Sequence, residues 1–550
     1  MPYPIRPAAL IAAALALAGC ASLPRERGYA DTQDLIKARR DVAPSATWAD
    51  VELAPEIPTS PISADDAVRL AFFNSPRIRE EYARLGLGRA ELEDARRISN
   101  PTFGYQRLRP RGADGQQVTR SLSMGLTDLL LLPARKRFAE GDLDRLQKAV
   151  AGALLELASE VEAAWYEAVS AQQIATMRDL LAQAAENSAE LAQRFLDAGN
   201  ITRLQHAQEL AAAAMARIDA VRAGAEANRA RSRLAGLIGL PSSADWRTQS
   251  ELPAPLTEPV NSTSLVALAL ENRLDLAAAR QAVALREDAL GVTRRWRWLG
   301  SVEVGAERES ELDGGVLRGP SLALELPLFN QGQGAVARAD AELLQARAEL
   351  DALLLQIQND AHLSVEALTV TGDIVERYRR ELVPQRETIV AESQKEVNFM
   401  LIGVFELLLA KQQEYDAYQE YLEAVRDYWT TRAELRRAVG GRLPDDGASR
   451  EPAIGVNAIL PDQGTKMDMG MDGMDHSSHG AMNHAPATGA SKPMPVPADE
   501  PAPASSADPH AGHAMPTAPA DPHAGHRMNP APKQADKDAP AAPEQHGDRP

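Results

Sequence analysis

The C-terminal part of the chain concentrates side chains that bind soft metal ions. Eight of the ten histidines and eight of the thirteen methionines lie after Lys466. The octapeptide Asp-Pro-His-Ala-Gly-His-X-Met occurs twice, starting at Asp508 and at Asp521. Thioether sulfur is a soft ligand suited to Cu(I), whereas imidazole accepts Cu(II), Zn(II) or Ni(II). Methionine with histidine and without cysteine favours copper or silver in an oxidising compartment, where thiols are lost to disulfides.

These residues predict a metal-binding tail over residues 444–550, which is rich in Pro, Ala and Asp and has no apolar periodicity. Such a composition is typical of disorder. The alternative is a solubilising tail of biased composition. The candidate ligands are Met467, Met469, Met471, Met474, His476, His479, Met482, His484, His510, His513, Met515, His523, His526 and Met528.

The only cysteine, Cys20, lies at the end of a signal-like segment. Arg6 supplies a positive charge, an apolar stretch follows, and small residues precede the cysteine, as in a secretory signal peptide over residues 1–19. Leu-Ala-Gly-Cys also resembles a bacterial lipobox, in which the cysteine becomes the lipidated first residue. Ala21 then implies export to the outer membrane. The alternative is an ordinary signal peptide with a chance cysteine.

The rest of the chain offers no catalytic group. His206 and His362 are single histidines in helical patterns, and we find neither a phosphate-binding glycine loop nor a nucleophile motif. The formal charge of −18 argues against a nucleic-acid partner, because no basic field is present to hold phosphates. We therefore predict a protein that is not an enzyme and needs no cofactor.

The body of the chain is duplicated. Ala71 and Asn74 lie 198 residues before Ala269 and Asn272. Two copies of a unit of about 200 residues indicate pseudo-symmetry within one subunit rather than a solenoid. Further matches are Ser121 with Ser321, Gly199 with Gly403, Leu204 with Leu408, and Gln208 with Gln412. The predicted parts are the signal peptide 1–19, an extended N-terminal tether 20–62, a first repeat 63–250, a second repeat 251–443, and the tail 444–550.

Each repeat contains two segments that alternate in polarity and predict half-buried strands, over about 101–108, 119–127, 301–308 and 320–327. Phe103 and Tyr105 share one face, while Ser301, Glu303 and Glu307 share a polar face that would line water. The length is also what a tilted membrane strand needs. A soluble hairpin packed on helices is the alternative.

Long helices connect these strands. From Pro133 to Gly199 no proline interrupts the chain, and about 62 helical residues would extend ~93 Å. Aromatic residues make up only 4% of the chain, as in coiled coils. A structural dimeric coiled coil is the alternative, but it leaves the duplicated strands without a role. One apolar stripe runs from Leu143 to Ala175, and a second uses Leu204, Ala207, Leu210, Ala214, Ile218 and Val221.

Residues 60–443 resemble the TolC-type outer-membrane efflux family. The resemblance rests on the segment Arg194–Thr202, the segment Leu401–Leu408, and Leu326–Gly332, in this order and spacing. It implies a mainly α-helical chain with a small β part. Three such chains would share a helical coiled-coil tube and a transmembrane β-barrel, with four strands from each chain.

The resemblance also implies partners. An inner-membrane pump and a periplasmic adaptor would complete the efflux system, and the adaptor would dock at two hairpin tips. The tip residues are Gly199, Asn200, Ile201 and Thr202 in the first repeat, and Gly403, Val404 and Phe405 in the second. Some relatives carry acidic residues after the second tip, but this chain has Leu408 and Leu409. Arg203 and Glu406 are therefore either a replacement gate pair or two solvated charges.

We thus predict an outer-membrane exit duct that exports copper or silver. The first alternative is a duct for drugs or organic toxicants with an accessory metal-binding tail. The second is a metal-sequestering coiled-coil lipoprotein without transport.

The lipidation of Cys20 can be tested directly. We expect Cys20→Ser to incorporate no radiolabelled palmitate and to keep its signal peptide, because the acyl chains need the thiol and processing follows acylation. Labelled whole cells resolved on a gel report both effects. Label retained by the variant would show that the anchor lies elsewhere.

Overall fold

The structure, a computed structural model, describes residues 29–40, 59–109, 111, 115–256 and 262–444. The predicted signal peptide, Cys20 and all predicted metal ligands of the tail lie outside these residues. Within the described ranges, no helix has the length and apolarity needed to cross a membrane.

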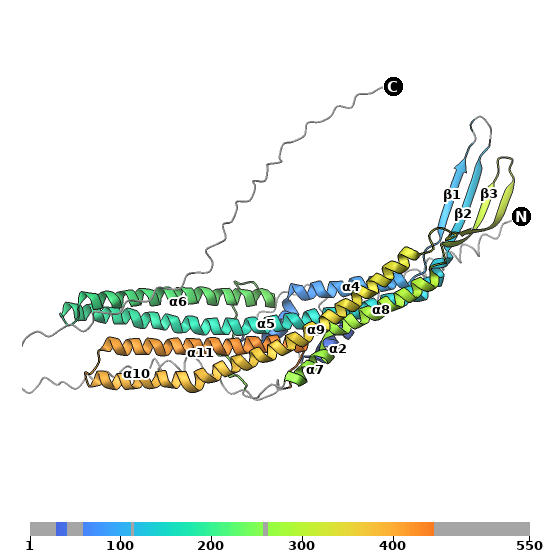
Figure 1. The fold of residues 1–550 in the computed structure, drawn as a ribbon. Helices are drawn as coiled ribbons and strands as arrows, with labels where there is room; N and C mark the ends of the chain where they lie inside the picture. The colour runs from blue at the N-terminus through green and yellow to red at the C-terminus, as the bar shows by residue number, and fades with distance from the viewer. Residues whose placement is uncertain (1–28, 41–58, 110, 112–114, 257–261, 445–550) are drawn as a thin grey trace, which may run out of the picture. The chain divides into compact units, whose positions relative to one another are not determined.

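The two repeats share one order of elements, except that the single helix after the strands of the first repeat corresponds to two helices joined by a π-helical turn in the second (Figure 1). Helix α2 (Tyr29–Lys37) precedes them. The first repeat comprises α3 (Ala64–Asn74), α4 (Pro76–Arg96), β1 (Thr102–Leu108), β2 (Gln117–Gly125), α5 (Leu126–Asp197) and α6 (Arg203–Ile238). The second comprises α7 (Ser262–Asn272), α8 (Leu274–Trp296), β3 (Val302–Ser310), β4 (Val316–Leu324), α9 (Gln333–Arg377), a π-helical turn (Tyr378–Leu382), α10 (Val383–Asn398) and α11 (Val404–Val439).

Helix α5 begins earlier than the sequence predicted. It starts at Leu126 and runs for 72 residues with Pro133 inside it, so that residues 126 and 127 are helical rather than the end of a strand. Proline removes one backbone donor and costs about 3 kcal/mol in a helix interior. A helix of this length continues because the hydrogen bonds and packing of its other turns outweigh that local cost.

Each repeat breaks its first helix at the same place, where the last helix of the repeat ends. In the first repeat, Gly239 follows α6 with a φ of +75°, and a Cβ there would lie 2.6 Å from the backbone of Asn74. In the second, Gly440 follows α11 with a φ of +78°, and a Cβ would lie 3.0 Å from the Cα of Arg273. Glycine is needed at both because the chain turns left-handed against another backbone.

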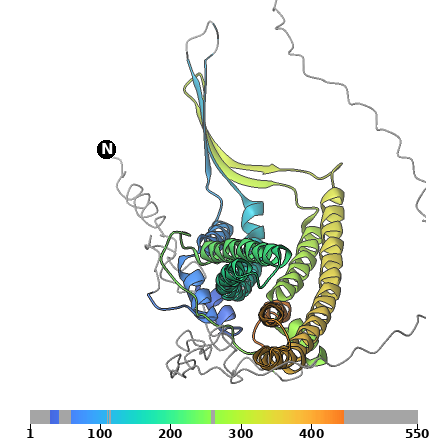
Figure 2. The ribbon, with the colours of Figure 1, turned by 90° about the vertical axis from the view of Figure 1, so that its left-hand side faces the viewer.

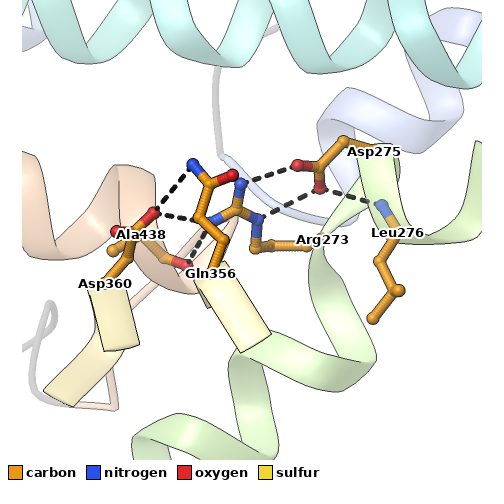
Figure 3. Close-up of polar contacts among 6 residues, drawn as sticks. All are labelled: Arg273, Asp275, Leu276, Gln356, Asp360 and Ala438. Atoms are coloured by element: carbon orange, nitrogen blue, oxygen red, sulfur yellow. Dashed lines mark hydrogen bonds and ion pairs between the residues drawn. The ribbon is translucent and has the colours of Figure 1, made fainter. Parts of the chain in front are cut away.

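Arg273 connects the break in the second repeat to two further helices (Figure 3). Its guanidinium group donates to Asp275 at 2.6 and 3.1 Å and to the carbonyl oxygen of Ala438 at 3.5 Å. Asp360 of α9 lies 3.8 Å away. One side chain therefore holds α8, α9 and α11 together.

The predicted extended tether contains helix α2, which packs on α5. Tyr29, Thr32 and Ile36 are buried there, because they recur at helical spacing and face the apolar surface of α5. Just after α2, Arg40 donates to the buried carboxylate of Glu162 at 2.6 Å, and Arg436 of α11 donates to the other oxygen. Three distant segments thus meet at one buried carboxylate.

The main core lies where α5 and α11 cross near the short helices. The rings of Tyr166 and Trp429 stack at 5.3 Å, and Trp165 meets Tyr166 edge-on at 5.2 Å. The indole nitrogens donate to the carbonyls of Ile62 and Pro253. The loops before and after the first repeat are therefore fastened to the core.

The first predicted apolar stripe packs inside the chain, whereas the second does not. Leu143, Val150, Leu154 and their successors to Ala168 on α5 are buried. On α6 the buried residues are Ala213, Ala220, Ala227, Leu234, Ala235 and Ile238. The stripe predicted there faces outward instead, because alanines allow α6 to lie close against α5. Its members are Leu204, Ala207, Leu210, Ala214, Ile218 and Val221.

The four strands form one antiparallel sheet in the order β1-β2-β3-β4 (Figure 2). The two repeats therefore join through β2 and β3, where Leu122 lies opposite Ala306. The sheet extends beyond the ends of the helices, and the β3–β4 turn lies at its far end (Figures 1 and 2).

Glu162 provides a test of the buried cluster. Burial raises the pKa of its carboxyl, but the charges and hydrogen bonds of Arg436 and Arg40 lower it below its ordinary value. The resulting stabilisation is complete above the unfolded-state pKa of about 4.3 and is lost as the pH falls through the lower folded value.

We expect Glu162→Ala to lower the free energy of unfolding by about 3–5 kcal/mol at pH 7, because two arginines lose their buried partner. Urea unfolding of the detergent-solubilised protein measures this loss, and below pH 4 the difference from wild type should shrink. The control is Glu160→Ala on the same helix, whose exposed pair with Arg77 should contribute no more than about 1 kcal/mol. Equal losses in the two variants would contradict the assignment.

Candidate functional site

The first hairpin tip is a helix-ending turn followed at once by a capped helix. Gly199 has a φ of +76°, and the Asn200 amide donates to the carbonyl of Phe195 at 2.8 Å. This pattern is a Schellman motif, in which glycine avoids the steric cost of a Cβ. Thr202 then caps α6 in a reciprocal capping box with Gln205.

The second tip has the same backbone but different residues. Met400 occupies the left-handed position with a φ of +59°, and the Leu401 amide donates to the carbonyl of Glu396 at 2.9 Å. Gly403 has an extended conformation and precedes α11 as its N-cap residue.

The structural match between the tips therefore differs from the match predicted from sequence. Gly199 corresponds to Met400, and Thr202 corresponds to Gly403, an offset of 201 residues rather than 204. The prediction paired Gly199 with Gly403 because they are separated by the same 204 residues as Leu204 and Leu408. Backbone geometry shows instead that methionine holds the left-handed position, at a cost of roughly 1–2 kcal/mol.

The two tips lie side by side in one chain. The rings of Phe195 and Phe405 meet edge-on with centroids 6.4 Å apart. Of the predicted docking residues, Gly199, Asn200, Thr202 and Gly403 are exposed, and the others are half-buried: Ile201, Val404 and Phe405. The structure thus presents both predicted tips on one surface.

Sequence reasoning missed the most exposed apolar group of this surface. Phe399, Met400 and Leu401 are 77%, 92% and 72% exposed. We call these three residues the apolar tip. The available signal was a run of four apolar residues, from Phe399 to Ile402, immediately before Gly403, because a turn between two helices normally carries polar residues.

The proposed gate pair is not formed within one chain. Arg203 and Glu406 are both exposed. Among the described residues, no ion pair joins them or links either to another residue. Their role as a gate remains a prediction about neighbouring copies.

The sheet has two unlike faces, as its alternation predicted. Residues directly opposite in the register share a face, so Ser121 lies beside Glu307, and Ser123 beside Gly305. Glu303 and Glu307 are exposed on this polar face, as is Ser301 just before β3. The other face carries Phe103, Leu122, Val304, Ala306, Leu322 and Leu324.

The described residues contain no group of three or more His, Cys, Asp or Glu side chains that could hold a metal ion. His206 is half-buried in α6 and His362 is exposed on α9. The metal ligands predicted from sequence all belong to the tail.

Comparison with known proteins gives a consistent picture. No protein-family model matches the chain. The chain is 23% identical over 342 residues to the cobalt-zinc-cadmium resistance protein CzcC of Cupriavidus metallidurans, an alignment that covers 61% of this chain and 80% of the relative. The structure is similar to the CmeC outer membrane channel of Campylobacter jejuni, with a TM-score of 0.58, 14% identity and coverage of 73% of this chain and 93% of that one.

A crystal structure of CusC, described in terms of transmembrane channel formation, has a TM-score of 0.57 and 15% identity and covers 74% of this chain and 99% of its own. The chain has the fold of these outer-membrane channels. Together with the similarity to CzcC, this confirms the predicted resemblance to TolC-type efflux proteins. The two solved structures are described as channels, which agrees with the prediction that this chain is not an enzyme.

The energetic cost of a Cβ in the left-handed backbone conformation can be tested at both tips. We expect Gly199→Ala to reduce the hydrogen-exchange protection of the Asn200 amide about five- to thirtyfold, because a Cβ in this conformation costs roughly 1–2 kcal/mol. Met400→Gly should raise the protection of the Leu401 amide, because it removes the same cost.

Met400→Ala serves as the matched control, since alanine keeps the Cβ but removes the thioether side chain. If Met400→Ala protected Leu401 as much as Met400→Gly does, then side-chain contacts rather than backbone strain would set the local stability.

Proposed function

We propose that the chain forms a trimeric exit duct in the outer membrane that receives metal ions from a periplasmic adaptor and an inner-membrane pump. One observation carries the proposal above all others. The two repeats merge their strands into a single two-faced sheet, and two very long hairpins extend from that sheet. Such an arrangement suits a tube that continues from a membrane into an aqueous space.

The edges of the sheet support assembly of several copies. Within one copy β1 and β4 are the edge strands, and backbone groups at an edge buried in lipid would cost several kcal/mol each. Pairing β1 of one copy with β4 of the next satisfies these groups. With three copies the ring closes around the polar face, and the apolar face meets lipid.

The outer surface of the helices supports the same assembly. Leu204, Ile218 and Val221 on α6 are 69%, 48% and 63% exposed, and Leu344, Leu355 and Leu363 on α9 are exposed to a similar degree. Apolar stripes of this length on a single chain indicate a partner surface. Neighbouring copies would cover them and complete the wall of the tube.

The hairpin tips supply the docking surface for the adaptor. Both tips lie together, and the apolar tip presents Phe399, Met400 and Leu401 to solvent. An adaptor with an apolar surface at its end would cover these side chains. Arg203 and Glu406 lie next to the same surface and would meet across neighbouring copies if they form a gate.

Two observations support metal ions as the cargo. The tail combines Met and His without Cys, a donor set that favours copper or silver, and the similar CzcC is named for resistance to cobalt, zinc and cadmium. The Met and His donors belong to this chain, whereas cobalt, zinc and cadmium are named for a relative. We therefore propose copper or silver as the cargo. Lipid attached to Cys20 would anchor the duct, and the tail would bind the ions in the periplasm.

The growth of a deletion strain tests the cargo. We expect the deletion strain to be sensitive to copper and silver, and we expect expression of the full chain to restore its growth. Its sensitivity to organic toxicants should change little. A chain truncated after Leu460 should restore growth only in part if the tail collects ions. If the deletion strain is sensitive only to cobalt, zinc and cadmium, these metals rather than copper and silver are the cargo. If it is sensitive only to organic compounds, the chain is a duct for organic compounds.

The duct itself is tested with purified protein in planar bilayers. Stepwise ion conductance is the expected result, because the polar face of the closed sheet encloses water. A preparation that forms no pore and restores metal tolerance by binding ions would support the metal-sequestering lipoprotein instead.

A further inference from the structure

Three arginines stand in one row across the apolar face of the sheet. The register places Arg120 of β2 directly opposite Arg308 of β3, and Arg308 directly opposite Arg318 of β4. Tyr105 of β1 continues the row beyond Arg120. We call Arg120, Arg308 and Arg318 the arginine row. Since opposite residues share a face, the three side chains leave the sheet on the same side.

The arginine row has no neutralising partner among the described residues. All three side chains are exposed, and no ion pair or hydrogen bond joins any of them to another residue of that part of the chain. The nearby carboxylates Glu307 and Glu309 occupy the alternate positions of β3 and therefore belong to the polar face. Like charges directly opposite each other destabilise a sheet, so the row has an energetic cost that a bound anion would remove.

The position of the row along the strands is informative. On the same face, the adjacent row towards the helices contains Phe103, Leu122, Ala306 and Pro320, and the one after it contains Met124, Val304 and Leu322. These apolar rows form a band between the arginines and the helices. The adjacent row away from the helices contains Arg107, Val118, Ser310 and Val316. The arginine row thus lies between this apolar band and the end of the sheet at which the β3–β4 turn, residues 311–315, is found.

A groove runs over this part of the face. It has a volume of about 530 Å³, and its lining includes Phe103, Leu122, Pro320 and the three arginines. An occupant would therefore meet positive charge at one end and apolar surface at the other. Arg120 and Arg318 are separated by two strand spacings, or about 10 Å, which is enough for a headgroup that carries more than one phosphate.

We propose that the arginine row binds the phosphate groups of lipid A in the outer leaflet of the outer membrane, with the acyl chains on the apolar rows below. This inference rests on the proposed function, because it needs the apolar face in lipid and the helices in the periplasm. Guanidinium groups bind phosphate through paired charge-assisted hydrogen bonds. Tyr105, in the same row, is the kind of side chain that lies at the level of headgroups.

Binding is measured with the full-length protein in detergent, by titration with lipid A and detection of protein–lipid complexes by native mass spectrometry. The test variant is Arg120→Gln/Arg308→Gln/Arg318→Gln. We expect it to bind lipid A at least about tenfold more weakly, because the charge-assisted hydrogen bonds from the guanidinium groups to the phosphates are lost. Dephosphorylated lipid A should bind wild type and variant equally.

The matched control removes the same number of exposed arginines from helix α6, as Arg217→Gln/Arg222→Gln/Arg229→Gln. It should keep the affinity of wild type. Equal loss in the two triple variants would show an unspecific charge effect and would overturn the proposal. The same holds if the test variant binds lipid A as wild type does, or if inorganic phosphate displaces lipid A completely at millimolar concentration.

Conductance in planar bilayers separates this inference from the proposed function. Wild type and both variants should form pores, which shows that the variants fold and assemble. If wild type forms pores but binds lipid A no more tightly than dephosphorylated lipid A in the titration, the arginine site is refuted and the duct is not. Absence of pores in wild type would refute the duct itself.

Discussion

The pairing of β2 with β3 is the interaction on which the rest of the architecture depends. It joins two repeats that each contribute only one hairpin, and a lone hairpin is marginally stable at best. The joined sheet has two edges and two unlike faces. In the proposed duct, neighbouring copies cover the unpaired edges and lipid covers the apolar face, so the proposed assembly depends on this one pairing.

Duplication has preserved backbone geometry while side-chain chemistry diverged. Gly239 and Gly440 end the two hairpins in the same left-handed conformation against the same helix break. At the tips the backbone is again shared, but Gly199 is replaced by Met400. A methionine held at 92% exposure in a strained conformation contributes nothing to the core. Its place at the tip is consistent with contact to a partner.

Charged side chains have different roles in two parts of the chain. Glu162 is buried between Arg40 and Arg436, where the charges compensate each other and hold the N-terminal segment to the long helices. The arginine row of the sheet is exposed and uncompensated within one copy. A buried charge without a partner destabilises the protein, whereas the exposed charges on the apolar face are those that we propose a lipid phosphate neutralises.

The sequence by itself determined the periodic features: the strand alternation, the long helices, the duplication, and the resemblance to a channel family. These are properties of neighbouring residues in the sequence. Local geometry alone places Phe103 and Tyr105 on one face of a strand, and Leu143 and Val150 on one face of a helix. Only the tertiary structure decided which stripe of α6 is buried, that Met400 rather than Gly403 matches Gly199, and that α2 forms within the predicted tether. It also decided that Arg120, Arg308 and Arg318 stand in one row. Each of these depends on register and packing between segments far apart in the chain, and local sequence preference does not encode such pairings.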